Sequence, residues 1–269
     1  MAKFILTGFA DEIDPDLSVQ LAHLRKNDIA YMECRNIGDK CVIDYDDAQV
    51  KAFAREMADN GIQVSALGSP IGKYPIEEPF APHLDRFKRA MEVAHLLGTG
   101  YIRMFSFFLP KDADPAQYRS EVMKRWEGFI EAAQGEKLIL LHENERDIYG
   151  ENAERCRDLL DTMKSPILKA IFDPANFVLC GVQIWPAFEL LRDQVIYLHI
   201  KDGRIADGKV VPSGQGDGMI PEVLQALKDS NFEGFLSVEP HLVNNMPGGG
   251  PELFAVAVQA LWDVIEKLQ

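Results

Sequence analysis

The feature that most constrains the fold of this chain is a regular alternation of strand-like and helix-like segments from one end to the other. Each short apolar run is followed by a stretch with apolar residues at helical spacing, as over residues 115–133, where Tyr118, Val122, Trp126 and Phe129 share one face. Strands that alternate with helices form a parallel sheet with right-handed crossovers. The eight strand-like runs are FILTGFA (4–10), IAYMECR (29–35), QVSALGS (63–69), YIRMFSF (101–107), KLILLHENE (137–145), LKAIFDPAN (168–176), VIYLHIKDG (195–203) and GFLSVEPH (234–241).

The number of these units predicts the fold class. Eight strand–helix units within a chain of 269 residues have the size and count of a single (β/α)8 TIM barrel. The alternative is an open doubly wound sheet, which normally carries a G-x-G-x-x-G turn after its first strand. That turn reads GFADEIDP here, and no linker or change of composition divides the chain. We therefore predict one α/β barrel domain over residues 1–269.

The charge, the hydropathy and the cysteine content predict which classes of partner the protein lacks and in which cellular compartment it lies. The chain has 42 acidic and 28 basic residues and a net charge of −14, which repels phosphate backbones, so we expect no nucleic-acid partner. No apolar run approaches the roughly 18 residues that cross a bilayer, so we expect no membrane partner. The N-terminal stretch lacks the features of a signal peptide. Four cysteines without a CxxC pair predict reduced thiols and a cytoplasmic protein.

The ends of the last four strands carry the candidate active site. A TIM barrel forms its active site at the carboxyl ends of its strands, and side chains alternate between the two faces of a strand. In the seventh run, Leu198 and Ile200 suit the outer face, which turns His199 inward. The same alternation in the other three runs turns Glu143, Asp173 and Glu239 inward. We therefore expect four side chains to point to one place: Glu143, Asp173, His199 and Glu239.

Three carboxylates and one imidazole form an oxygen-rich ligand set. Such a set suits one divalent metal ion, Mn²⁺, Mg²⁺, Co²⁺ or Zn²⁺, and does not suit a thiolate-dependent site. Without a cation, converging carboxylates would repel one another and raise one another's pKa values. No cysteine lies near these positions, which favours a catalytic metal over a structural one.

The strand endings HEN, FDPAN, LHIKD and SVEP resemble the metal-binding strands of the xylose-isomerase-like superfamily. That superfamily contains sugar isomerases and epimerases, inosose dehydratases and an abasic-site endonuclease branch. The resemblance implies that Glu143 and Glu239 are metal ligands and the two acid/base groups, with Asp173 and His199 completing the coordination. The family often has histidine three residues after the aspartate, where this chain has Asn176, which cannot transfer a proton.

Further polar residues at strand ends are candidates for orienting the hydroxyls, a carboxylate or a phosphate of a substrate. Glu33 and Arg103 fit a buried ion pair equally well, and Arg35 is a weaker candidate. His142 faces outward by alternation and is assigned a structural role, and the GFADE stretch is assigned no chemistry. The predicted substrate-binding residues are Glu33, Arg103, Asn176, Lys201, Arg204 and His241.

These residues lead to one main functional hypothesis and three alternatives. The main one is a metal-dependent isomerase or epimerase of a small sugar or related polyol-ketone, which moves a proton through an enediolate. The first alternative is a metal-dependent dehydratase of an inosose- or dehydroshikimate-type cyclic substrate. A hydrolase of abasic DNA sites is disfavoured by Asn176 and by the acidic charge, and the ligand set argues against a non-catalytic sugar-binding barrel. The resemblance also suggests a homo-oligomer.

Overall fold

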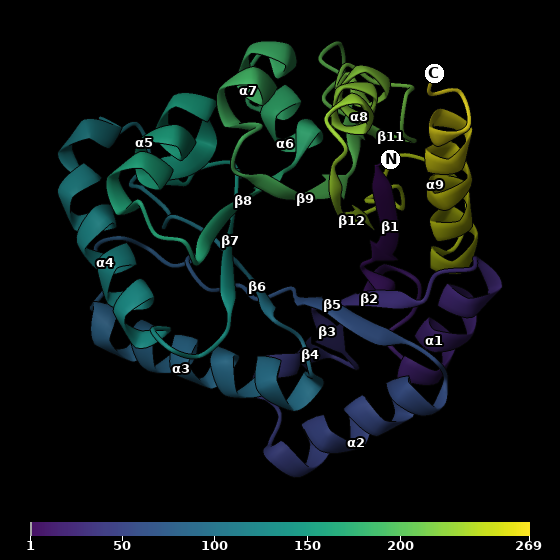
Figure 1. Ribbon diagram of the computed structural model, residues 1–269, viewed down its shortest axis with the longest axis horizontal. Coiled ribbons are helices and arrows are strands. Elements are labelled where there is room, and N and C mark those ends of the chain that lie inside the picture. The colour runs from purple at the N-terminus through teal and green to yellow at the C-terminus, as the bar shows by residue number, and fades with distance from the viewer. Residues whose placement is uncertain (1) are drawn as a thin grey trace.

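The computed structural model describes residues 2–269 and shows eight parallel strands in a ring, with the helices packed around the outside (Figure 1). The hydrogen-bonded order of the strands is β1-β12-β9-β8-β7-β6-β5-β2, and β1 and β2 lie next to each other at the seam, without a ladder between them within these residues. The single (β/α)8 TIM barrel is therefore confirmed. The strands are β1 (Lys3–Gly8), β2 (Tyr31–Cys34), β5 (Gln63–Leu67), β6 (Tyr101–Met104), β7 (Ile139–Glu143), β8 (Leu168–Phe172), β9 (Val195–Ile200) and β12 (Glu233–Val238).

Four of the helices, α1, α2, α5 and α6, begin at a residue whose side chain caps the first turn. The Asp46 side chain accepts from the backbone N–H of Gln49, whose side chain returns a hydrogen bond, and this capping box starts α2. The predicted helix over residues 115–133 begins with a separate 3-10 turn, Pro115–Gln117, before α4. The helices are α1 (Leu17–Lys26), α2 (Asp47–Asp59), α3 (Phe80–Leu97), α4 (Arg119–Ala132), α5 (Ala153–Met163), α6 (Pro174–Leu179), α7 (Ile184–Leu191), α8 (Ile220–Asp229) and α9 (Gly250–Ile265).

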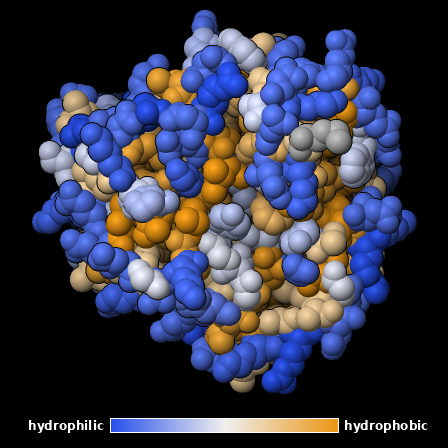
Figure 2. Space-filling model, viewed as in Figure 1, coloured by the Kyte–Doolittle hydropathy of each residue, from blue (hydrophilic) through white to orange (hydrophobic). Residues whose placement is uncertain are grey.

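The apolar residues form two layers, as expected for a barrel. A large cluster fills the space between strands and helices, and a small one inside the barrel consists of Ala66, Leu141, Ile171 and Tyr197. Leu198 lies in the outer cluster and Tyr197 in the inner one, which confirms the predicted alternation along β9. On the face shown in Figure 2, hydrophilic residues dominate the periphery and hydrophobic residues gather nearer the middle.

The alternation of side chains along β7 also holds for His142, which directly precedes Glu143. His142 is buried, its Nε2 lies 2.9 Å from the Ser106 hydroxyl, and its ring packs edge-on against Trp126. These contacts lie between the barrel and its helices, so the outward orientation predicted for His142 is confirmed.

Two short hairpins that the sequence did not predict stand at the strand ends: β3 (Asn36–Ile37) with β4 (Lys40–Cys41), and β10 (Asp202–Gly203) with β11 (Val210–Val211). The buried Asp202 carboxylate accepts from the backbone N–H groups of Gly203, Gly214, Gly216 and Gly218. An added Cβ at Gly216 would lie 2.4 Å from Asp202 Oδ1, so this loop requires glycine there. Asp202 thus fixes the loop that follows β9.

None of the helices in residues 2–269 combines the length and the apolar character that crossing a bilayer requires.

Candidate active site

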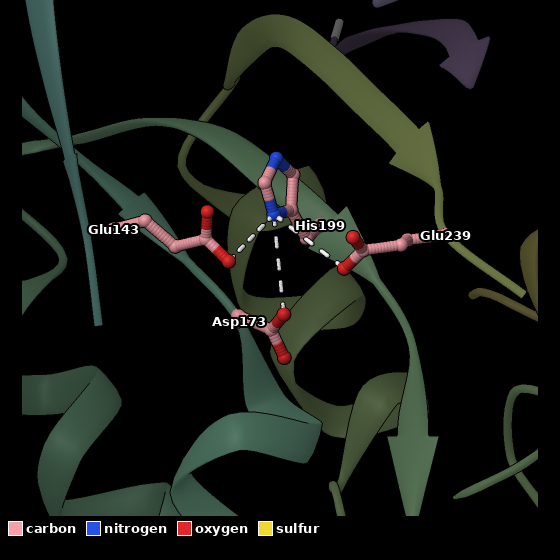
Figure 3. A group of neighbouring side chains, drawn as sticks. All are labelled: Glu143, Asp173, His199 and Glu239. Carbon is pink, nitrogen blue, oxygen red and sulfur yellow. Dashed lines mark ion pairs between the residues drawn. The ribbon is translucent and has the colours of Figure 1, made fainter. Parts of the chain in front are cut away.

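Four strand ends bring Glu143, Asp173, His199 and Glu239 into one buried cluster, as the alternation of side chains predicted. Glu143 is the last residue of β7, Asp173 and Glu239 directly follow β8 and β12, and His199 lies near the end of β9. One ligand atom from each side chain lies within 4.8 Å of the others. Figure 3 shows Glu143 and Glu239 on opposite sides of the His199 ring edge, with Asp173 below it.

The His199 ring presents its Nδ1 atom to the carboxylates. This atom lies 3.1 Å from Glu143 Oε1, 3.9 Å from Asp173 Oδ2 and 4.0 Å from Glu239 Oε2. The other ring nitrogen, Nε2, lies 3.2 Å from Glu33 Oε2, and the Tyr197 hydroxyl donates to the same carboxylate at 2.8 Å. Glu33 therefore fixes the orientation of the ring, as carboxylates do behind metal-binding histidines.

The carboxylates decide the charge of His199. Burial would lower the pKa of His199, but Glu143 and Glu33 outweigh it and raise the pKa to about 10. The imidazole therefore carries a proton, whose charge balances part of the negative charge of the carboxylates.

Each of the two glutamates is paired with an arginine. Arg103 Nη1 lies 3.3 Å from Glu143 Oε2, and Arg35 Nη1 lies 3.0 Å from Glu239 Oε1. Burial would raise the pKa of Glu143, but His199 and Arg103 outweigh it and lower the pKa to about 2. Burial likewise opposes ionisation of Glu239, whose pKa is nevertheless held well below its usual range, chiefly by a neighbouring lysine, Lys201. Both glutamates are ionised at neutral pH.

Asp173 differs from the two glutamates. Burial raises its pKa to about 6, and the charges of Glu143 and Glu239 add to this effect, while Lys201 opposes it. The Lys201 ammonium lies 2.9 Å from Asp173 Oδ2 and 2.7 Å from Glu239 Oε2. Lys201 is therefore part of the cluster, and it points away from its neighbour Asp202.

Some of the remaining predicted substrate-binding residues contact the cluster, and one does not. Asn176 donates from Nδ2 to Glu143 Oε1 at 3.2 Å, at the edge of the cluster. Glu33 and Arg103 do not pair with each other, because Glu33 holds His199 and Arg103 holds Glu143. Arg204 is not brought to the cluster: its guanidinium is exposed and pairs with Asp207, three residues further on.

The sequence reasoning missed the contribution of the GFADE stretch. Asp11 Oδ2 accepts from Arg35 Nε at 2.7 Å, and Glu12 Oε1 lies 3.3 Å from Arg35 Nη2. Glu12 also accepts from the backbone N–H of His241 and lies 3.1 Å from its Nε2, while that Nε2 is 3.4 Å from Glu239 Oε1. The sequence did hold a signal for this contribution, because two acidic residues follow the first strand at the end where the site forms.

Comparison with known protein families finds one that matches most of the length of this chain. The family described as xylose isomerase-like TIM barrel matches residues 21–260. The chain belongs to this family.

The solved structures similar to this xylose isomerase-like barrel share its fold at low sequence identity. The IOLI protein, whose structure holds a zinc atom, has a TM-score of 0.80 at 18% identity, with 99% of each chain covered. L-ribulose 3-epimerase has a TM-score of 0.77 at 16% identity, covering 100% of this chain and 96% of that one. A probable 3-DHS dehydratase, AsbF from Bacillus anthracis, has a TM-score of 0.76 at 15% identity, with 97% and 99% covered. No curated protein matches the sequence.

Three buried atoms in this xylose isomerase-like barrel test whether the cluster fits a metal ion. Glu143 Oε2, Asp173 Oδ2 and His199 Nδ1 are buried and have no hydrogen-bond partner among the described residues, although charged groups lie nearby. Each of these atoms meets a charged group instead: Lys201 Nζ lies 2.9 Å from Asp173 Oδ2, Glu143 Oε1 lies 3.1 Å from His199 Nδ1, and Arg103 Nη1 lies 3.3 Å from Glu143 Oε2. A divalent cation would take the place of the lysine and of the imidazole proton beside these atoms, and carboxylate with imidazole is a ligand set for such ions. The residues therefore fit a metal.

Proposed function

We propose that this protein is a divalent-metal-dependent isomerase or epimerase of a small sugar or related polyol-ketone, working by proton transfer. The observation that supports this most is the position of Glu143 and Glu239 on opposite sides of one cluster (Figure 3). Two carboxyl groups that face the same point from opposite sides allow one, as carboxylate, to remove a proton from a carbon, while the other, once protonated from solvent, delivers a proton to the opposite side. The epimerases among the similar structures are consistent with this chemistry.

Residues of this chain would bind the metal ion, transfer the proton and orient the substrate. Glu143, Asp173, His199 and Glu239 would hold the divalent ion, which supplies Lewis acidity that favours loss of a proton beside a carbonyl. One of Glu143 and Glu239 takes up that proton as a carboxylate. The other must first take a proton from solvent before it can return one to the substrate carbon, and the first carboxylic acid releases its proton to solvent afterwards. The ion pairs of Glu143 with Arg103 and of Glu239 with Arg35 hold the two side chains in place. Asn176 lies where its amide can hydrogen-bond a substrate hydroxyl.

Solvent isotope exchange tests the proposal. The metal-loaded protein is incubated in D₂O with a panel of ketoses, inososes and their phosphates, and deuterium at carbon is followed by NMR. We expect deuterium in the product and a loss of exchange of at least 100-fold in Glu143→Gln and in Glu239→Gln. Glu189→Gln, an exposed glutamate on α7, is the matched control and should exchange normally. Isomerisation without deuterium would refute proton transfer and indicate a hydride shift.

A dehydratase is the second candidate, and the position of Lys201 favours it. Its ammonium is buried beside Asp173 and Glu239, where it can donate a proton to a hydroxyl that leaves from the carbon next to an enolate. The likeness to a probable 3-DHS dehydratase is consistent with this chemistry. Loss of water from a cyclic ketone gives an enone, so a new ultraviolet absorbance with inososes or dehydroshikimate would distinguish the dehydratase from the isomerase.

A further inference from the structure

A cavity of about 350 Å³ opens directly beside the four-residue cluster. Lys201 and Asn176 line it and also contact the cluster, since Lys201 pairs with Glu239 and Asn176 with Glu143. This volume lies at the lower end of the range for small-molecule sites. A substrate whose reacting carbon lies at the cluster can therefore extend into this cavity.

The walls of the cavity carry more positive than negative charge. Lys73, Arg146 and Lys201 face two acids, Glu145 and Asp147. Glu145 is already neutralised, because its Oε2 lies 2.8 Å from Lys73 Nζ. The remaining charged groups are Lys201 at the inner end, Arg146 and Asp147 at the outer end, and His241, whose pKa burial would lower but its contacts with Glu12 and Glu239 raise to about 9.

Arg146 is distinctive because its guanidinium has no carboxylate partner within residues 2–269. Its side chain donates one long hydrogen bond, from Nη2 to the Leu179 carbonyl at 3.4 Å, and is otherwise exposed. Most other arginines at this end of the barrel are paired: Arg35 with Asp11, Arg103 with Glu143 and Arg204 with Asp207. A guanidinium with free N–H groups at a cavity mouth is suited to bidentate binding of an anion.

Occupation of the cluster would strengthen this charge. Asp173 and Glu239 balance Lys201 in the structure described here, and both are ligands in the proposed metal site. When a divalent cation binds the same two carboxylates, their charge no longer compensates the ammonium. Lys201 then adds a net positive charge to the inner end of the cavity.

We propose that this cavity is an anion subsite, so that the substrate is an acidic polyol-ketone with a carboxylate or phosphate at the end remote from the reacting carbon. Arg146 binds that group at the mouth, and Lys201 contributes attraction from the inner end. This inference rests on the proposed isomerase or epimerase function and names its substrate class. Phe108, Leu179 and Val210 form the apolar walls between the two cations.

The first test uses substrates matched in carbon skeleton: a neutral ketose, its terminal phosphate and the corresponding terminal carboxylate. Deuterium exchange by the metal-loaded enzyme should have a kcat/KM at least 10-fold higher for one of the anionic forms. Arg146→Gln should raise KM for that form about 10-fold with kcat within twofold, because the lost interaction is equal in ground and transition states. Arg192→Gln, which replaces an exposed arginine directly after α7, is the control of equal charge change.

The outcomes separate this inference from the proposed function. Exchange with the neutral ketose as fast as with both anionic forms would overturn the anion subsite and leave the isomerase proposal intact. A second measurement does not depend on turnover: calorimetry of inorganic phosphate and of malonate with the metal-loaded protein at constant ionic strength. We expect Arg146→Gln to weaken binding of one of them about 10-fold, with Arg192→Gln unchanged. Equal binding by wild type and Arg146→Gln would overturn the subsite even if no substrate in the panel reacts.

Discussion

Replacement of Lys201 by methionine should tighten metal binding, because the lysine and the ion require the same two carboxylates. The ammonium lies 2.9 Å from Asp173 Oδ2 and 2.7 Å from Glu239 Oε2. An ion bound to these oxygens at about 2.1 Å would lie at most about 5 Å from the ammonium. Charges of +2 and +1 at that separation repel by about 7 kcal/mol at an effective dielectric constant of about 20.

The measured effect should be smaller than this repulsion, because the lysine can turn into the adjoining cavity when the ion binds. We expect Lys201→Met to increase metal affinity about 10- to 100-fold, or about 1.4 to 2.7 kcal/mol. The metal-free variant should be less stable than wild type by about 3 kcal/mol, since removing one partner leaves buried carboxylates uncompensated. That value is at the lower end of the range because Asp173, with a pKa raised to about 6, can take up a proton.

Two measurements check this prediction: titration calorimetry with Mn²⁺ and Zn²⁺, and urea unfolding of the metal-free proteins. Lys169→Met is the matched control, since Lys169 lies on β8 and its ammonium contacts only Gln194 among the described residues. The control should bind metal as wild type does. A folded Lys201→Met protein with unchanged or weaker metal affinity would refute the idea that the lysine and the ion compete.

Three further outcomes are expected. Glu33→Leu removes the carboxylate that orients His199, so metal affinity measured by calorimetry should fall about 10- to 100-fold, and an unchanged affinity would mean that the ring is held by packing alone. Removal of metal with EDTA should lower the free energy of unfolding by about 2.7 kcal/mol relative to protein with free metal at about 100 times its Kd, and an equal melting temperature would argue against a specific site. Burial lowers the pKa of His142 to about 4, so the unfolded chain, with a histidine pKa near 6.5, binds this proton first as the pH falls. The contribution of the neutral His142 ring to the free energy of unfolding is therefore fully present above about pH 6.5 and declines by about 3 kcal/mol toward pH 4. His142→Gln should flatten this pH dependence, measured by urea unfolding at a series of pH values.

The part of the site that the sequence could predict depends on strict local geometry. Side chains alternate along a strand, so the positions of Leu198 and Ile200 on the outer face were enough to turn His199 inward. The same argument applied to Glu143 and Glu239, because the carboxyl ends of parallel barrel strands meet on one side. The fold was predictable for a related reason: alternation of strands and helices leaves few other topologies.

What the sequence could not predict depends on loops, where no period fixes the direction of a side chain. Arg35 and Glu12 lie beyond the ends of their strands and meet only because two loops fold toward each other. Arg204 was predicted to bind substrate from its position near β9, but the turn of its hairpin brings Asp207 within 2.7 Å. Helix α6 was missed because it has only six residues and its N-cap is Asp173, which also belongs to the cluster.

The seam between β1 and β2 has a consequence for any attempt to redesign this protein. Those two strands share no ladder within residues 2–269, and Arg35 spans the gap at the active-site end by pairing with Asp11, Glu12 and Glu239. One guanidinium thus both pairs with a proposed catalytic carboxylate and links β1 to β2 at the seam, where no ladder joins them within the described residues. Changes of Arg35 made to alter specificity will therefore also loosen the barrel. Amide hydrogen exchange in β1 and β2 would reveal that loosening before any loss of overall helix content.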